Sequence, residues 1–223
     1  MPSRIDHPST PTAGALVTPT GGRGPTGNPE AKAAGDQSRN ESSESAGEVI
    51  AVIGAGRVGR ALARRAAVAG YRVVLEDLIP TSLEAARREI RQSLDEAVAD
   101  GSLDPSAAGQ AFARIECASS IEDAARRAHI VMETGPDEFE SKLEMFCLLD
   151  RICLPGTVIV SNCHALDLSD TAAKAEAIVG MYFSGDEAEI HCSAFTSARA
   201  LEVAERLARR MASSYRITRD GSR

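Results

Sequence analysis

Three glycines with a characteristic spacing follow the first apolar run of the chain. Residues 49–53 read Val-Ile-Ala-Val-Ile, and Gly54, Gly56 and Gly59 come next as G-x-G-x-x-G. The first glycine allows a sharp turn, the second leaves room for a ligand, and the third lets a helix approach the strand. The first amide N–H groups of that helix are unpaired, and its dipole favours an anion. The pattern predicts a loop that binds the diphosphate of a dinucleotide through Gly54, Gly56, Arg57, Val58 and Gly59.

An acidic residue stands at the distance that such a loop requires. Asp77 lies 23 positions after Gly54, and we expect it to accept hydrogen bonds from the adenosine ribose. A carboxylate there repels a 2′-phosphate, and residues 78–83 contain no Arg or Lys, which favours NAD over NADP. Arg57, inside the loop, complicates this choice. The alternative interpretation is a glycine turn in an α/β protein that binds no ligand.

These residues require a strand, a helix and a second strand in close succession. The apolar run 48–53, a helix over 57–69 that ends at Gly70, and the apolar run 72–77 form one βαβ unit. From residue 48 onward, apolar strands and amphipathic helices alternate, which indicates a parallel sheet with helices on both faces. The fold class that we predict is therefore α/β.

Two consecutive helices are predicted before the third strand. The sequence from Thr81 to Glu84 resembles a capping box that opens a helix over about 82–99. Asp104 and Pro105 predict an N-cap and a first-turn proline for a short helix that ends near 113. Further strands are expected at 115–117, 129–133, 157–161, 177–183, 189–195 and 215–218. Further helices are expected after the cap at 119–122 and at 137–152 (with Phe139, Leu143, Phe146 and Leu149 inward), 168–175 and 199–211.

Composition limits the domain organisation and the function. The chain has 223 residues, 43% of them hydrophobic, and a net charge of −7, which argues against general binding to nucleic acid or an anionic membrane. Residues 1–47 hold six of the ten prolines, so we expect a disordered tail there and one folded domain over 48–220. Five cysteines without metal-ligand spacing fit free thiols in a reducing cytoplasm, and we expect no metal site.

The chain resembles the NAD-binding domain of the 3-hydroxyacyl-CoA dehydrogenases. The resemblance runs in order over about 48–220, through the segments 52–60, 70–77, 131–133, 142–146, 161–162 and 179–181. It implies a Rossmann-type, doubly wound, mostly parallel sheet with an inserted helical pair. It also implies NAD as cofactor, an acyl-CoA-type substrate, and an oxidoreductase of fatty acid metabolism that acts on a 3-hydroxyacyl or 3-oxoacyl thioester.

The cofactor residues of the family have counterparts in this chain. Besides the glycines and Asp77, the resemblance places Glu133 and Lys142 near the nicotinamide side of the cofactor, and Asn162 beside the nicotinamide ribose. The end of a strand favours a functional role for Glu133, because ligands bind outside the carboxyl ends of the strands. A solvated helix lysine is the alternative for Lys142.

The residues that the family uses for proton transfer are replaced. Tyr182 stands where the family has a histidine that takes the hydroxyl proton, and the family's orienting glutamate aligns near Ala194. His164 aligns with the serine that contacts the substrate oxygen. His164 and Tyr182 are the candidate acid–base residues, although an unperturbed tyrosine has a pKa of about 10 and needs a nearby cation to act. His191 is interpreted as a structural or surface residue.

The family continues into a helical domain where this sequence ends, near residues 219–221. That domain completes the acyl-CoA cleft and the usual dimer, so we expect a second copy or a partner chain to replace it. Two hypotheses follow from the intact cofactor half and the altered chemical half. One is an NAD-dependent oxidoreductase with a changed site, and the other is a non-catalytic NAD-binding regulatory or assembly subunit.

Overall fold

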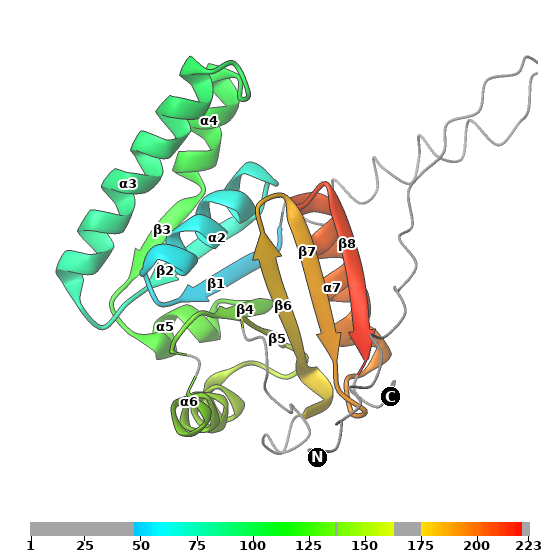
Figure 1. The fold of residues 1–223 in the computed structure, drawn as a ribbon. Coiled ribbons are helices and arrows are strands. Elements are labelled where there is room, and N and C mark those ends of the chain that lie inside the picture. Colours follow the sequence, from blue (N-terminus) through cyan, green and yellow to red (C-terminus); the bar gives the residue numbers. More distant parts are fainter. Residues whose placement is uncertain (1–46, 137, 163–174, 220–223) are drawn as a thin grey trace, which may run out of the picture.

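The computed structural model describes residues 47–136, 138–162 and 175–219. The predicted tail over 1–47 and the helix predicted for 168–175 fall almost wholly outside these residues. The described residues form one eight-stranded sheet with helices on both faces, as Figure 1 shows. The strands are β1 (Val49–Ile53), β2 (Arg72–Glu76), β3 (Ile115–Ala118), β4 (Ile130–Glu133), β5 (Val158–Ser161), β6 (Ile178–Ser184), β7 (Glu187–Cys192) and β8 (Ser214–Arg219).

The strand order is β3-β2-β1-β4-β5-β6-β7-β8. Strands β1 to β6 are parallel, β7 runs antiparallel to β6, and β8 runs parallel to β7. Strand order reverses between β1 and β4, and in an open α/β sheet a ligand binds at such a switch point, outside the carboxyl ends of the strands. The predicted Rossmann-type, mostly parallel sheet is therefore confirmed.

The helix after the glycine loop begins at the predicted residue and ends one residue earlier than predicted. Helix α2 (Arg57–Val68) buries its small apolar face against the sheet, and Gly70 adopts a φ of +98° just beyond its end. That left-handed conformation is accessible to glycine without strain, so Gly70 ends the helix as expected. Tyr71 N donates to Ala66 O at 3.1 Å and returns the chain towards β2.

The inserted helical pair is present, but its first helix begins earlier than predicted. Helix α3 (Pro80–Ala99) starts at Pro80 after an extended Ile79, and no side chain caps it, so the capping box at Thr81 is wrong. The fixed φ of Pro80 already suits the first helical position and sets the start two residues earlier. Helix α4 (Pro105–Ala113) is capped by Asp104, whose side chain accepts from Ser106 N and Ala107 N, as predicted.

Two helices cover the other face of the sheet. Helix α5 (Ile121–Arg126) is capped by Ser120, one residue later than the start of the predicted cap. Helix α6 (Phe139–Ile152) buries Phe146 and Leu149 as expected, but Phe139 is 48% exposed and Lys142 is buried. The inward face of α6 is thus rotated from the predicted one, because Lys142 has an acidic partner inside the protein.

The core divides into two layers, one on each face of the sheet. The helices α2, α3, α4 and α7 (Ala198–Met211) contribute to one layer, and α5 and α6 contribute to the other. In Figure 1, α7 lies behind β6, β7 and β8, and the front face of these three strands is not covered by a described helix. That uncovered face lies on the same side of the sheet as α5 and α6.

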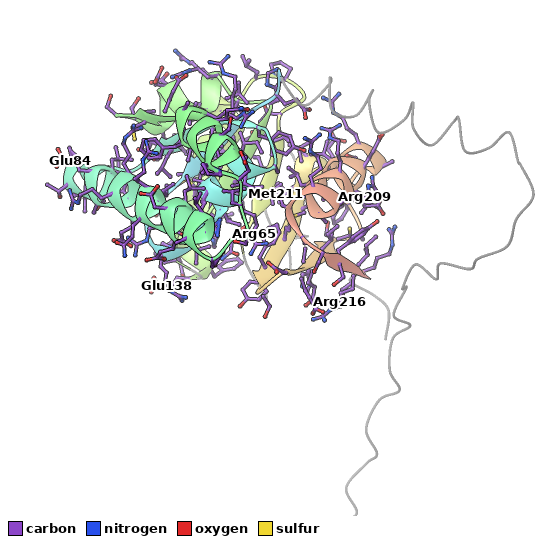
Figure 2. All side chains as sticks on the ribbon, turned by 90° about the horizontal axis from the view of Figure 1, so that it is seen from above. Arg65, Glu84, Glu138, Arg209, Met211 and Arg216 are labelled. Carbon is purple, nitrogen blue, oxygen red and sulfur yellow. The ribbon has the colours of Figure 1, made fainter. Side chains whose placement is uncertain are left out.

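A tight hairpin joins β6 to β7 and is tied to α2. Gly185, in the turn, has a φ of +57°. The last residue before the turn, Ser184, pairs with the first residue after it, Glu187. Arg65 donates to Gly185 O and to Met211 O, both at 2.7 Å, which connects the hairpin and the end of α7 to α2 (Figure 2). The short turn determines which residues of β6 and β7 face each other.

Candidate cofactor and active site

The glycine loop has the backbone geometry of an anion cradle. Gly54 adopts a φ of +101°, and its N–H donates to Glu76 O at 2.9 Å, which turns the chain sharply off β1. Helix α2 begins after Gly56 with no side-chain cap and no acidic residue in its first turn. The first amides of the helix therefore lack a side-chain partner, which fits a diphosphate at this position.

The second and third glycines meet different constraints. A Cβ on Gly59 would lie 1.8 Å from Gly54 O, so only glycine lets the helix approach the loop this closely. A Cβ on Gly56 would meet no protein atom within 4 Å. Gly59 is thus required by the fold, while Gly56 borders open space where a ligand can approach the backbone.

Asp77 is fixed beside this loop by two backbone donors. Its Oδ2 accepts from Ala55 N at 2.8 Å, and its Oδ1 accepts from Ile79 N at 2.9 Å. Each carboxylate oxygen has a further lone pair, so Asp77 can still accept from ribose hydroxyls. The carboxylate therefore lies at the edge of the cradle, as the sequence predicts.

A second acid lies buried next to Asp77. Glu76, the last residue of β2, is 1% exposed, and its Oε1 has no hydrogen-bond partner among the described residues. Burial, with a smaller contribution from the charge of Asp77, raises the pKa of Glu76 to about 7. Sequence reasoning missed this residue, because an acid before Asp77 in an apolar run carries no recognisable motif.

The loop after β4 is connected to the glycine loop. Thr134 Oγ1 lies 2.8 Å from Ile53 O, to which it donates, and 3.3 Å from Gly54 O. A Cβ on Gly54 would lie 2.8 Å from the same hydroxyl oxygen. The two loops that flank the switch point therefore form one continuous surface.

Glu133 and Lys142 form a buried charge pair at the carboxyl end of β4. Lys142 Nζ lies 2.5 Å from Glu133 Oε2, and both side chains are 1% exposed. Lys142 also donates to Gly135 O at 3.2 Å, while Gly135 N donates to Glu133 Oε1 at 2.6 Å. The alternative of a solvated Lys142 is wrong.

The next strand adds a hydroxyl and an amide to this cluster. Ser161 Oγ donates to Glu133 Oε2 at 3.0 Å, and Asn162 N donates to Glu133 O at 2.9 Å. In the sheet register, Ile53 pairs with Glu133, Glu133 with Ser161, and Ser161 with Gly180. The structure therefore brings Glu133, Lys142 and Asn162 together at one edge, next to the glycine loop.

Of the two candidate acid–base residues, the structure describes only Tyr182. His164 lies outside the described residues. Tyr182 lies on β6, and its partner across the hairpin is Glu189 of β7. Ala194, near which the family's orienting glutamate aligns, lies two residues beyond the end of β7.

Sequence reasoning missed Glu189, although the sequence contains a signal for its position. The alignment with the family directed attention to Ala194. However, Gly185 and Asp186 between two alternating strands are typical of a two-residue hairpin. Counting back from that turn pairs Tyr182 with Glu189, as the structure does.

The remaining side chains indicate neither a metal site nor a membrane span. In the described part of the chain, no disulfide bond involves Cys117, Cys147, Cys153 or Cys192. Over the same residues, no group of three or more His, Cys, Asp or Glu side chains is arranged to hold a metal ion. No helix among the described residues has the length and apolar character needed to cross a membrane.

The known proteins that this chain resembles include several 3-hydroxybutyryl-CoA dehydrogenases. A probable 3-hydroxybutyryl-CoA dehydrogenase of Bacillus subtilis is 33% identical over 137 residues, which cover 60% of this chain and 47% of that protein. The 3-hydroxybutyryl-CoA dehydrogenase of Bradyrhizobium diazoefficiens is 29% identical over 137 residues, covering 60% and 46%. The chain thus spans about half the length of these curated relatives.

Solved structures share the fold. The crystal structure of (S)-3-hydroxybutyryl-CoA dehydrogenase from Ralstonia eutropha has a TM-score of 0.72 and 22% identity, and covers 77% of this chain and 63% of that chain. A family model for the NAD binding domain of 3-hydroxyacyl-CoA dehydrogenase matches residues 49–211, well over half of the sequence. The chain therefore belongs to the 3-hydroxyacyl-CoA dehydrogenase family, as an NAD-binding domain whose cofactor is NAD.

Proposed function

We propose that the chain is an NAD-dependent oxidoreductase that interconverts a 3-hydroxyacyl thioester and the corresponding 3-oxoacyl thioester. The observation that carries this proposal is the buried cluster of Glu133, Lys142 and Ser161 beside the glycine loop. Burying two charges at the end of the sheet costs desolvation free energy on folding. A pair that adds little stability is better explained by a role in positioning a ligand. Bound NAD supplies a hydride acceptor.

Each cofactor residue has a specific role in this proposal. Gly54, Gly56 and the first amides of α2 bind the diphosphate, and Asp77 accepts from the adenosine ribose. Asn162 and the Glu133–Lys142 pair orient the nicotinamide half. Lys142 cannot move far, because Glu133 Oε2 and Gly135 O both accept from its ammonium group.

The reaction also requires a group that takes the hydroxyl proton. His164 and Tyr182 are the candidates that the sequence offers. His164 lies outside the described residues, and the cross-strand partner of Tyr182 is Glu189. Both residues therefore remain predictions, to be separated by single substitutions.

The substrate that we propose is an acyl-CoA thioester. The curated relatives named above are dehydrogenases of 3-hydroxybutyryl-CoA, and the chain spans about half of their length. We therefore propose that a second copy of the chain, or a partner chain, completes the acyl-CoA cleft. Sedimentation velocity with and without NADH and 3-oxobutanoyl-CoA tests this directly, and a monomer under all conditions contradicts it.

A spectroscopic assay tests the proposed activity. The absorbance of NADH is followed with a panel of 3-oxoacyl-CoA substrates of increasing chain length, for the wild type and for His164→Ala and Tyr182→Phe. Binding of NADH is measured in parallel by fluorescence. Turnover by the wild type supports the proposal, and the affected variant identifies the proton carrier.

The alternative function predicts a different result from the same assay. A regulatory or assembly subunit binds NADH but turns over none of the 3-oxoacyl thioesters in the panel. That outcome would overturn the oxidoreductase proposal and leave the assignment of the cofactor site intact.

A further inference from the structure

The uncovered face of β6, β7 and β8 carries a group of polar side chains. Along β7, Ala188, Ile190 and Cys192 are buried against α7, so the alternate residues point to the opposite face. The register places Tyr182 and Gly180 of β6, and Arg216 and Thr218 of β8, beside those alternate residues. The polar group consists of Tyr182, Glu189, His191, Arg216 and Thr218.

Glu189 is the acceptor at the centre of this group. Arg216 donates to its Oε2, and Thr218 Oγ1 donates to its Oε1 at 3.1 Å. The hydrogen bond from Arg216, together with the nearby His191, holds the pKa of Glu189 below its ordinary value, although burial opposes this. Glu189 is therefore a fixed carboxylate at neutral pH, and its side chain is only 19% exposed.

His191 lies against Glu189, and one nitrogen of its ring has no hydrogen-bond partner among the described residues. Its Nε2 is 3.4 Å from Glu189 Oε1, and it is a buried atom without a hydrogen-bond partner among the described residues. Across the hairpin His191 faces Gly180, where an added Cβ would lie 3.0 Å from the His191 Cβ. The missing side chain of Gly180 therefore provides the space that the imidazole occupies.

The register places this imidazole level with the cofactor cluster. Glu133, Ser161, Gly180 and His191 are successive partners across β4, β5, β6 and β7. Neighbouring strands lie about 4.8 Å apart, so the backbone of His191 is roughly 10 Å from that of Ser161. Ser161 and His191 therefore stand on either side of Gly180 on the same face of the sheet.

We propose that His191 is the residue that exchanges the proton of the substrate oxygen, and that Glu189 positions its ring. This inference rests on the proposed function and deepens it. In the oxidation, the His191 imidazole takes the proton of the 3-hydroxyl group as the C3–H bond breaks. That hydrogen leaves with its electron pair to oxidised NAD, and the C3–O bond becomes a carbonyl.

The chemistry of the side chains favours His191 over Tyr182 in this role. An imidazole titrates near neutral pH, whereas a phenol releases its proton near pH 10. The imidazolium that forms lies beside the Glu189 carboxylate, which stabilises its positive charge. Tyr182 shares the same acidic neighbour, which does not stabilise a phenolate.

Matched substitutions on β7 test the assignment by turnover. Oxidation of NADH by 3-oxobutanoyl-CoA is measured for wild type, His191→Asn, Glu189→Gln, His164→Ala and Tyr182→Phe. Glu187→Gln is the control, because Glu187 is an exposed acid on the same strand and face. We expect a loss of about 100-fold or more in kcat for His191→Asn, about 10-fold for Glu189→Gln, and less than about 2-fold for Glu187→Gln. Affinity for NADH should be unchanged in all three.

A second readout does not depend on turnover. Ring signals of 13C-labelled histidine are recorded with oxidised NAD and 3-oxobutanoyl-CoA, a pair that cannot react because both are oxidised. The signal absent from the His191→Asn spectrum should move when the thioester is added. The signal of His129, whose Nδ1 accepts from Val49 N at the opposite end of the sheet, should stay in place.

The outcomes separate this inference from the proposed function. Turnover that survives in His191→Asn, or that disappears only in His164→Ala or Tyr182→Phe, overturns the role of His191 and leaves the oxidoreductase intact. A His191 ring signal that does not move when the thioester is added also overturns the role of His191. Absence of turnover in the wild type across the substrate panel overturns both proposals. Should His191→Asn be unfolded by circular dichroism, His191→Gln is measured under the same criteria.

Discussion

Lys142 Nζ lies 2.5 Å from Glu133 Oε2 although the two side chains come from different elements and each is 1% exposed. The pair fixes α6 against the end of β4, at the edge where the candidate cofactor residues lie. Replacing a buried ion pair by apolar residues is often neutral or stabilising, whereas removing one partner is costly. The pair is therefore better explained by positioning than by stability.

Removing one member of this pair should unfold the domain more easily. We expect Lys142→Met to lower the free energy of unfolding by about 3–5 kcal/mol, because Glu133 is left as an unpaired buried charge. The double variant Glu133→Gln/Lys142→Met should recover most of this loss. Urea denaturation measures both, with Glu140→Gln on the exposed side of α6 as control. A single variant as stable as the wild type contradicts the buried pair.

Alanine substitutions at two glycines of the loop should have different effects, one on stability and the other on NADH affinity. Gly59→Ala places a Cβ 1.8 Å from Gly54 O, so we expect a loss of about 3 kcal/mol or more in stability. Gly56→Ala meets no protein atom, so its stability should change by about 1 kcal/mol or less while the affinity for NADH falls at least about 10-fold. Thermal unfolding and fluorescence titration separate the effects. Unchanged NADH binding in Gly56→Ala would show that the diphosphate lies elsewhere.

Asp77 should control the choice between the two dinucleotides. Asp77→Asn removes the charge that repels a 2′-phosphate and weakens the hydrogen bonds to the ribose. We expect its affinity for NADH to fall about 10-fold and the ratio of NADPH to NADH affinity to rise. Titrations with both cofactors measure the ratio, and Glu84→Gln, an exposed acid on α3, should leave it unchanged. A ratio that stays constant in Asp77→Asn would assign selectivity to another residue.

Glu76 should make the stability of the domain depend on pH. In the unfolded chain a glutamate titrates near pH 4.3, whereas burial raises the pKa of Glu76 to about 7 in the folded protein. Between these values the folded state keeps a proton that the unfolded state releases. The free energy of unfolding should therefore fall as pH rises from about 4.3 to about 7, by up to roughly 3 kcal/mol, and level off above that.

An isosteric substitution isolates this contribution. Glu76→Gln mimics the protonated acid at every pH, so it should be more stable than the wild type at pH 8 and similar to it at pH 4.5. Urea denaturation at pH 8 and at pH 4.5 measures the difference in free energy of unfolding between the two proteins. Equal stability of the two proteins at pH 8 would show that the buried carboxylate carries no penalty.

The sequence predicts the sheet and the cofactor loop because their signals are local. The spacing of Gly54, Gly56 and Gly59, the apolar run before them and the proline after Asp104 act on neighbouring residues. The start of α3 was misplaced because two local signals compete, and the fixed φ of Pro80 prevails over the capping pattern at Thr81.

The errors at the site have a different origin. Lys142 is buried because Glu133, nine residues earlier, lies within reach in the folded chain, and no helical periodicity indicates such a partner. Glu189 was missed because the alignment directed attention to Ala194, whereas the hairpin at Gly185 pairs Tyr182 with Glu189. Contacts between elements lie beyond single-residue patterns, whereas the hairpin at Gly185 and Asp186 can be identified from the sequence.

The two-residue turn between Ser184 and Glu187 sets the register of β7 against β6. Side chains alternate with a period of two, so one inserted residue would turn Glu189 and His191 towards α7 and bring Ala188 and Ile190 out to water. A compensating bulge would have to accompany any odd insertion. The length of one surface turn thus decides whether this end of the sheet presents ionisable groups or hydrocarbon to whatever molecule approaches it.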